Sequence, residues 1–232
     1  MSSMKTIGLI GGMSWESTLA YYRTINRATA AALGGLHSAP LVLDSLDLAE
    51  VAQLQYAGDW EALGEMMVAS ARKLERAGAD LLVLATNTMH KLAPQIEAAS
   101  NVPLLHIADA TADAARAQGI GTVGLLGTRF TMEQAFYRER LEANGLRVFV
   151  PPDAERQVVH DVIYDELCQG RFEEPAREAY RRTIAGLADR GAEGVVLGCT
   201  EIGLLVGPED AAIPLLDTAD IHARRAVALA LV

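Results

Sequence analysis

Two stretches of the sequence place small polar or nucleophilic residues directly after an apolar run. They are Gly78–Leu92, GADLLVLATNTMHKL, and Gly191–Leu205, GAEGVVLGCTEIGLL. The two agree in pattern along their length, and in this alignment Thr86 corresponds to Cys199. A short apolar run bounded by turn residues predicts a buried parallel strand. Thr86 and Cys199 would then follow the carboxyl ends of two strands, where open α/β sheets bind their ligands.

Cys199 has the chemistry of an acid or base. The reference pKa of a thiol, about 8.5, is close to neutral, and a helix N-terminus can lower it. Proton transfer works best when the pKa of the group is near the operating pH. The alternative is a small buried thiol that only fills space, but polar Thr200 and Glu201 follow Cys199 at once. The pattern therefore favours a functional thiol.

Thr86 is a weaker candidate when taken alone, because a hydroxyl is a poor general base. It could donate or relay a proton, or hold a water, if its neighbours orient it; the alternative is an ordinary helix N-cap. Its alignment with Cys199 favours a functional role. Asn87 and Thr88 at one helix start, and Thr200 at the other, offer hydrogen-bond donors to a substrate carboxylate, because helix N-termini bind anions.

The sequence contains an internal repeat with a period near 113 residues, which indicates two similar α/β halves. TVGLLGT at Thr122–Thr128 repeats TIGLIGG at Thr6–Gly12. Thr128 and Thr131 lie at the turn after the later copy, either as substrate contacts or in a solvated loop. Two further pairs match in the same order: Ala62–Arg76 with Glu174–Arg190, and Val102–Asp109 with Ile213–Asp220.

Alternating buried strands and helices predict an α/β protein of two pseudo-symmetric, doubly wound domains with mostly parallel four-stranded sheets. The first half is expected at residues 1–110, completed by residues 215–232, and the second at residues 111–214. We expect the active site in the cleft between the domains, with Thr86 and Cys199 on opposite walls. A proton-handling group on each wall suits inversion at a carbon atom.

Composition excludes several classes of function. The net charge of −10, with no cluster of Lys or Arg, argues against nucleic acid and anionic membranes as partners. The apolar run near the N-terminus is too short for a signal peptide, so we expect a cytoplasmic protein. The five histidines are scattered and the two cysteines lack metal-site spacing, so we expect no metal. The glycines at Gly8–Gly12 lack the spacing of a dinucleotide fingerprint.

Four motifs together resemble the aspartate/glutamate racemase family, which is related to glutamate and hydantoin racemases. They are GLIGGMSWEST at residues 8–18, TNTMHK at 86–91, LLGTRFTM at 125–132 and GCTE at 198–201. They occur in the order of the family and span nearly the whole chain. The resemblance implies a homodimer and racemisation of an amino acid without pyridoxal phosphate, metal or any other cofactor.

The resemblance also implies the roles of individual residues. Most members have two catalytic cysteines; here Cys199 matches the second and Thr86 replaces the first. A subgroup with TNTMHK at this place is associated with aspartate and glutamate, so the expected substrate is an acidic amino acid. The substrate contacts carried over by resemblance are Asn87, Thr88, Thr128 and Thr200, together with Met13 and Gln53.

One position departs from the family pattern. Some members have a Lys near the side-chain carboxylate of the substrate, two residues before the glycine that matches Gly170, and this chain has Cys168 there. Arg171 or Arg129 could supply the positive charge instead. The alternatives to an Asp/Glu racemase are a hydantoin racemase, decarboxylase or cis-trans isomerase of related fold, or a small-acid binding protein without catalysis.

Overall fold

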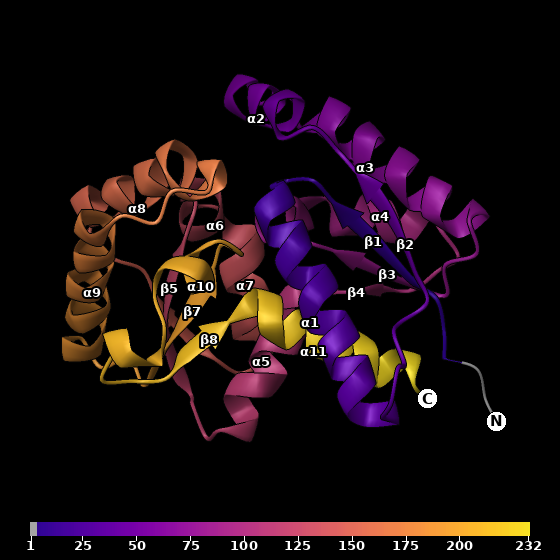
Figure 1. The fold of residues 1–232 in the computed structure, drawn as a ribbon. Coiled ribbons are helices and arrows are strands. Elements are labelled where there is room, and N and C mark those ends of the chain that lie inside the picture. The colour runs from indigo at the N-terminus through magenta and orange to yellow at the C-terminus, as the bar shows by residue number, and fades with distance from the viewer. Residues whose placement is uncertain (1–3) are drawn as a thin grey trace. The chain divides into compact units, whose positions relative to one another are not determined.

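The computed structural model describes residues 4–232, which divide into two compact units (Figure 1). Unit 1 runs up to His106 and resumes at His222–Val232, and unit 2 is Ile107–Ile221. The chain therefore passes between the units after His106 and again after Ile221, whereas the sequence analysis places the boundaries at residues 110 and 215. Within the described residues, no helix is long and apolar enough to cross a membrane.

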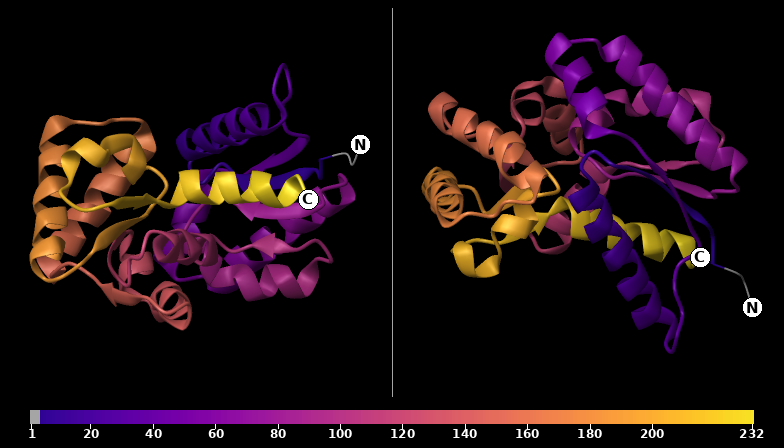
Figure 2. Two further views of the ribbon diagram at one scale, coloured as in Figure 1. Left: turned by 90° about the horizontal axis from the view of Figure 1, so that it is seen from below. Right: turned by 45° about the horizontal axis from the view of Figure 1, so that its top comes forward.

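Unit 1 is built on a parallel sheet in the order β2-β1-β3-β4. The strands are β1 (Ile7–Gly11), β2 (Leu41–Ser45), β3 (Leu81–Leu84) and β4 (Leu104–Leu105). The helices are α1 (Trp15–Leu33), α2 (Leu48–Ala57), α3 (Trp60–Arg76), the 3₁₀ helix η1 (Thr88–Leu92), α4 (Ala93–Ala99) and most of α11 (Thr218–Ala230). Helices α3 and α4 cover one face of the sheet, and α1 and α11 cover the other (Figures 1 and 2). Because both faces are covered, β1 and β3 are buried along their whole length.

Unit 2 repeats this order with its own parallel sheet, β6-β5-β7-β8. The strands are β5 (Thr122–Gly127), β6 (Arg147–Phe149), β7 (Gly194–Gly198) and β8 (Leu215–Asp217). The helices are α5 (Ile107–Ala117), α6 (Arg129–Glu133), α7 (Ala135–Ala143), α8 (Asp153–Asp165), η2 (Leu167–Gln169), α9 (Glu174–Asp189), α10 (Ile202–Leu205) and η3 (Pro208–Asp210). The predicted class, an α/β protein with two similar four-stranded parallel sheets, is confirmed.

The apolar periodicity of α3 shows how each unit forms its core. Leu63, Met67, Ala71 and Leu74 recur at helical spacing and are buried, and Met66 packs beside them. This stripe packs on the strands. Unit 2 has a separate cluster of buried apolar side chains.

Two segments of unit 1 form short regular elements. The chain after Asn87 begins with the 3₁₀ helix at Thr88, and α4 starts at Ala93, with a proline in its first turn. Proline favours the first turn of an α-helix because it has no N–H to donate there. Within the repeated segment Val102–Asp109, only Leu104–Leu105 form a strand, because α5 already begins at Ile107.

Candidate active site

The candidate residues of unit 1 follow β1 and β3, which are neighbours in the sheet. Ile10 pairs with Leu84, and the Ala85 amide donates to the Ile10 carbonyl oxygen at 2.9 Å. Met13 and Thr86 therefore leave the sheet at the same edge. Because β2 and β3 lie on opposite sides of β1, this edge is the point where the strand order reverses, and α/β folds bind ligands there.

The turn after β1 requires glycine. Gly12 has a φ of +86°, and a Cβ atom there would lie 2.0 Å from the carbonyl oxygen of Leu46. The Thr18 hydroxyl accepts a hydrogen bond from the Gly12 amide and donates one to the Ser14 carbonyl oxygen, each at 2.8 Å. Through these contacts the motif GGMSWEST forms a rigid turn with Met13 buried in it.

Thr86 is buried, and within residues 4–232 its hydroxyl makes no hydrogen bond to another protein group. The Thr86 carbonyl oxygen accepts a hydrogen bond from His90 Nδ1 at 2.7 Å. The N-cap alternative for Thr86 is wrong, because η1 begins at Thr88 with Asn87 in the capping position. Asn87 and Thr88 are buried beside Thr86. The Thr86 hydroxyl is thus held in place by its backbone and is available to a ligand.

The structure separates two glutamines of α2 that the sequence does not distinguish. Gln53 is exposed on the helix. Gln55 is buried, and its Nε2 donates to the sulfur of Met89, within the TNTMHK motif, at 3.2 Å. The amide that packs against this motif is therefore that of Gln55, whereas the resemblance points to Gln53.

The equivalent edge of unit 2 brings Thr128 and Cys199 together. The residues just before them, Gly127 and Gly198, are paired across β5 and β7. A Cβ atom on Gly127 would lie 2.6 Å from the Gly198 carbonyl oxygen, so the two strands approach closely only because these residues are glycine. Thr128 and Cys199 then emerge side by side, at about the spacing of neighbouring strands, ~5 Å.

Thr128 begins helix α6 as its N-cap. Its hydroxyl oxygen accepts from the amide of Thr131 at 3.3 Å, and the two hydroxyl oxygens are also 3.3 Å apart. Both threonines are buried, so the solvated-loop alternative is wrong.

The Cys199 thiol lies against a buried carboxylate. Its S–H donates to Glu201 Oε2 at 2.9 Å, and the Thr200 hydroxyl donates to the same oxygen at 3.1 Å. Burial, followed by the negative charge of Glu201 and the nearby thiol of Cys168, raises the pKa of Cys199 well above its usual value. The expectation that a helix N-terminus lowers this pKa is wrong, because α10 has only four residues and a carboxylate precedes it. The resting thiol is protonated and suited to donate a proton.

Cys168 belongs to the same electrostatic environment. It lies half-buried in η2, and burial followed by the charge of Glu201 raises the pKa of its thiol. The two arginines considered for a substrate carboxylate have partners already. Arg129 pairs with Glu133 at 3.1 Å, and the Arg171 guanidinium donates to the carbonyl oxygen of Asp165.

Histidines form a cluster in unit 1 that sequence reasoning missed. The ring of His90 lies 4.6 Å from that of His106 and 5.8 Å from that of His222. The internal repeat could have indicated the contact between His90 and His106. His90 aligns with Gly203 and His106 with Asp217. The second pair also lies close together, since a Cβ atom on Gly203 would lie 2.3 Å from Asp217 Oδ2. Among residues 4–232, no three His, Cys, Asp or Glu side chains are arranged to hold a metal ion.

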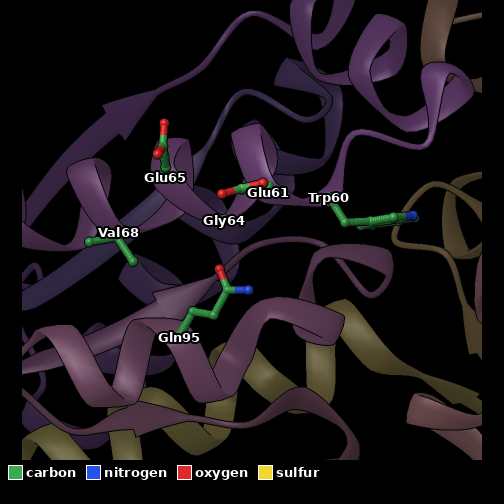
Figure 3. A pocket seen from close by; sticks show the side chains of 6 residues that line it. All are labelled: Trp60, Glu61, Gly64, Glu65, Val68 and Gln95. Carbon is green, nitrogen blue, oxygen red and sulfur yellow. The ribbon is translucent and has the colours of Figure 1, made fainter.

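A groove lies on unit 1 between α3 and α4. Trp60, at the start of α3, is one of its lining residues, and the Nζ of Lys91 in the TNTMHK motif lies 3.6 Å from the centroid of its ring. Figure 3 shows its lining, with the Gln95 side chain reaching toward Gly64. A Cβ atom on Gly64 would lie 1.8 Å from Gln95 Oε1, so glycine allows this close approach. None of the predicted site residues lines it: the lining residues are Trp60, Glu61, Gly64, Glu65, Val68 and Gln95.

Comparison with known proteins relates this arrangement to one family. Residues 10–226 match the family model for Asp/Glu/hydantoin racemases. A candidate Asp/Glu racemase from Yersinia pestis is 53% identical with a TM-score of 0.91, over 99% of this chain and 100% of that chain. An aspartate racemase homologue from Pyrococcus horikoshii OT3 is 35% identical with a TM-score of 0.85, over 99% and 100%.

A more distant relative is named as an amino-acid racemase. The broad specificity amino-acid racemase RacX of Bacillus subtilis (strain 168) is 26% identical over 73% of this chain and 73% of its own length. The family model covers far more than half of the sequence and includes both strand ends that carry Thr86 and Cys199. The chain belongs to the Asp/Glu/hydantoin racemase family.

Proposed function

We propose that this amino-acid racemase inverts the α-carbon of aspartate, glutamate or both by two-base proton transfer, without a cofactor. Cys199 acts on one face of the α-carbon and Thr86 on the other. The observation that carries the proposal is the equivalence of the two strand ends: in each unit, a buried proton-bearing group follows the third strand of the repeat. An inversion needs two such groups, because the proton leaves one face and another arrives on the opposite face.

Glu201 supports the role proposed for Cys199. When Cys199 donates, its proton moves to the α-carbon and leaves a thiolate. Before Cys199 can accept an α-proton, its own proton must move away, and Glu201 Oε2 lies at 2.9 Å to receive it. The pair then holds one negative charge whether the proton lies on sulfur or on oxygen, so this transfer adds no buried charge.

Thr86 supplies the second group in the proposal. Its hydroxyl is buried and makes no hydrogen bond within the described part of the chain, so it can point at a bound substrate. An aliphatic hydroxyl keeps its proton at neutral pH, so Thr86 rests in the protonated form and can deliver that proton to the carbanion. To remove an α-proton, Thr86 must first pass its own proton to a water molecule or to the substrate. Both transfers depend on precise placement, because a hydroxyl is a weak acid and a weak base.

The substrate class is proposed from the relatives that match over their full length. One is a candidate Asp/Glu racemase and the other an aspartate racemase homologue. The test is incubation in D₂O with both enantiomers of aspartate, glutamate and a panel of neutral and basic amino acids. Loss of the α-proton is followed by NMR, and inversion by chiral chromatography. Exchange of the α-proton confined to neutral or basic amino acids would contradict the proposed acidic substrate. Binding of an acidic amino acid without exchange would indicate a small-acid binding protein without catalysis.

The two proposed bases can be tested separately with β-chloroalanine. Removal of its α-proton by one base expels chloride from the β-carbon, and the resulting enamine hydrolyses to pyruvate and ammonia. Because no second proton transfer to the α-carbon is needed, each enantiomer reports on one base. We expect Cys199→Ala to abolish elimination from one enantiomer and Thr86→Val from the other. The assignment would be contradicted if both variants lost elimination from the same enantiomer, or if neither variant lost elimination from either one.

A further inference from the structure

The backbone of Thr86 is held from two sides. Its amide donates to the Leu84 carbonyl oxygen at 2.9 Å, and its carbonyl oxygen accepts from His90 Nδ1 at 2.7 Å. A carbonyl oxygen only accepts, so His90 Nδ1 carries the proton of that bond. The imidazole of His90 is buried almost completely. The hydrogen bond is therefore shielded from water and fixes the peptide that carries the Thr86 side chain.

The ring of His90 is in turn held by a network of buried side chains. It contacts the rings of His106 and His222 at 4.6 and 5.8 Å. His222 Nε2 donates to the Leu105 carbonyl oxygen at 3.0 Å, which leaves its Nδ1 to accept from the Tyr21 hydroxyl at 2.9 Å. These bonds fix the orientation of His222 and hence the surface against which His90 packs. The network draws on α1, η1, the end of β4 and α11.

The second half of the molecule has no such support. Gly203 occupies the position of His90 in the repeat, so no side chain there can hold the Cys199 carbonyl oxygen. That oxygen instead accepts from the Ile202 amide at 3.1 Å, within the local turn. The asymmetry follows the chemistry of the two groups. The reference pKa of a thiol is close to neutral, whereas a hydroxyl is a much weaker acid, so proton transfer by Thr86 depends more on being held in a reactive geometry.

We infer that His90 is a positioning residue for Thr86, acting through the hydrogen bond from its Nδ1 to the Thr86 carbonyl oxygen. This inference rests on the proposed proton transfer by Thr86. The bond reaches the carbonyl oxygen of Thr86 and not its hydroxyl, and in this role His90 exchanges no proton with the substrate. It sets the position of the peptide, and His106 and His222 keep its ring in place.

The test uses two variants of His90 and the two enantiomers of β-chloroalanine. His90→Leu keeps much of the volume and removes the donor. His90→Asn places an amide nitrogen where Nδ1 lies and keeps the donor. We expect His90→Leu to lower kcat for the enantiomer that depends on Thr86 by about 10- to 100-fold. Elimination from the other enantiomer stays within about twofold, and His90→Asn recovers most of the lost rate.

A matched control separates positioning from loss of stability. Tyr137 of α7 is the counterpart of Tyr21 in the repeat, is fully buried, and interacts with Thr111 through its hydroxyl. We expect Tyr137→Phe to lower the melting temperature while both enantiomers keep their relative rates. If His90→Leu lowered both rates equally, or if His90→Asn recovered nothing on the Thr86 face, the inference would be overturned.

Two further outcomes are distinguishable. If His90→Leu does not fold, His90→Gln is used instead, because its amide donor lies one bond further from the backbone than the donor of asparagine. We again expect a lower elimination rate only for the enantiomer that depends on Thr86. An equal loss of rate for both enantiomers overturns the inference. If Thr86→Val still eliminates chloride from both enantiomers, the proposed function itself has failed. If Thr86→Val loses elimination from one enantiomer and His90→Leu keeps full rates with both, only the positioning role is refuted.

Discussion

His222 makes the stability of unit 1 sensitive to acid. It is completely buried between Tyr21 and the Leu105 carbonyl oxygen. Burial, with a smaller contribution from His90, lowers the pKa of His222 from 6.5 to about 3. The folded protein therefore keeps this imidazole neutral at pH values where an unfolded chain would protonate it.

The sign and size of the effect follow from proton linkage. Below pH 6.5 His222 is protonated in the unfolded state, whereas in the folded state it becomes protonated only near pH 3. The free energy of unfolding thus falls with pH in this window, by at most about 1.4 kcal/mol per pH unit. Between pH 6.5 and pH 5 the loss amounts to about 2 kcal/mol. The stabilisation is fully present above pH 6.5 and is lost as the pH falls toward 3.

The measurement is urea unfolding of the wild type and of His222→Gln at several pH values between 7 and 5. Glutamine keeps a donor for the Leu105 carbonyl oxygen but does not titrate, and it removes the Nδ1 atom to which the Tyr21 hydroxyl donates. We expect the variant to be less stable at pH 7, with a difference from wild type that shrinks by about 2 kcal/mol toward pH 5. Parallel curves for the two proteins would refute a neutral, buried His222.

Two further predictions concern unit 2. Gly127→Ala places a Cβ atom 2.6 Å from the Gly198 carbonyl oxygen, and we expect it to lower the unfolding free energy, measured by denaturant titration, by about 1–3 kcal/mol. The control is Gly186→Ala in helix α9, which has open space around the added Cβ atom and should be neutral or stabilising. Equal effects of the two substitutions would contradict the close approach of the strands. Glu201→Gln removes the negative charge beside Cys199, so the pH at which iodoacetamide alkylates this thiol should shift downward, and an unchanged alkylation profile would show that burial alone sets its pKa.

The internal repeat was sufficient to predict the sheets. Matched segments at Thr6–Gly12 and Thr122–Thr128 correspond to β1 and β5, the central strands that pair with β3 and β7. Such strands are buried on both faces, so they read as continuous apolar runs, and the signal is local in sequence. The same reasoning predicted that Thr86 and Cys199 each follow a strand, which is where the structure places them.

Only the tertiary structure determined the environment of these two residues. A pKa depends on burial and on charges that arrive from distant parts of the chain, so the sequence suggested a lowered pKa for Cys199 where burial and Glu201 raise it. The support of Thr86 by His90 brings in His106 and His222, which lie far from each other in sequence. Local pattern therefore determined which residues end the strands, and long-range packing determined their protonation and the contacts that hold them.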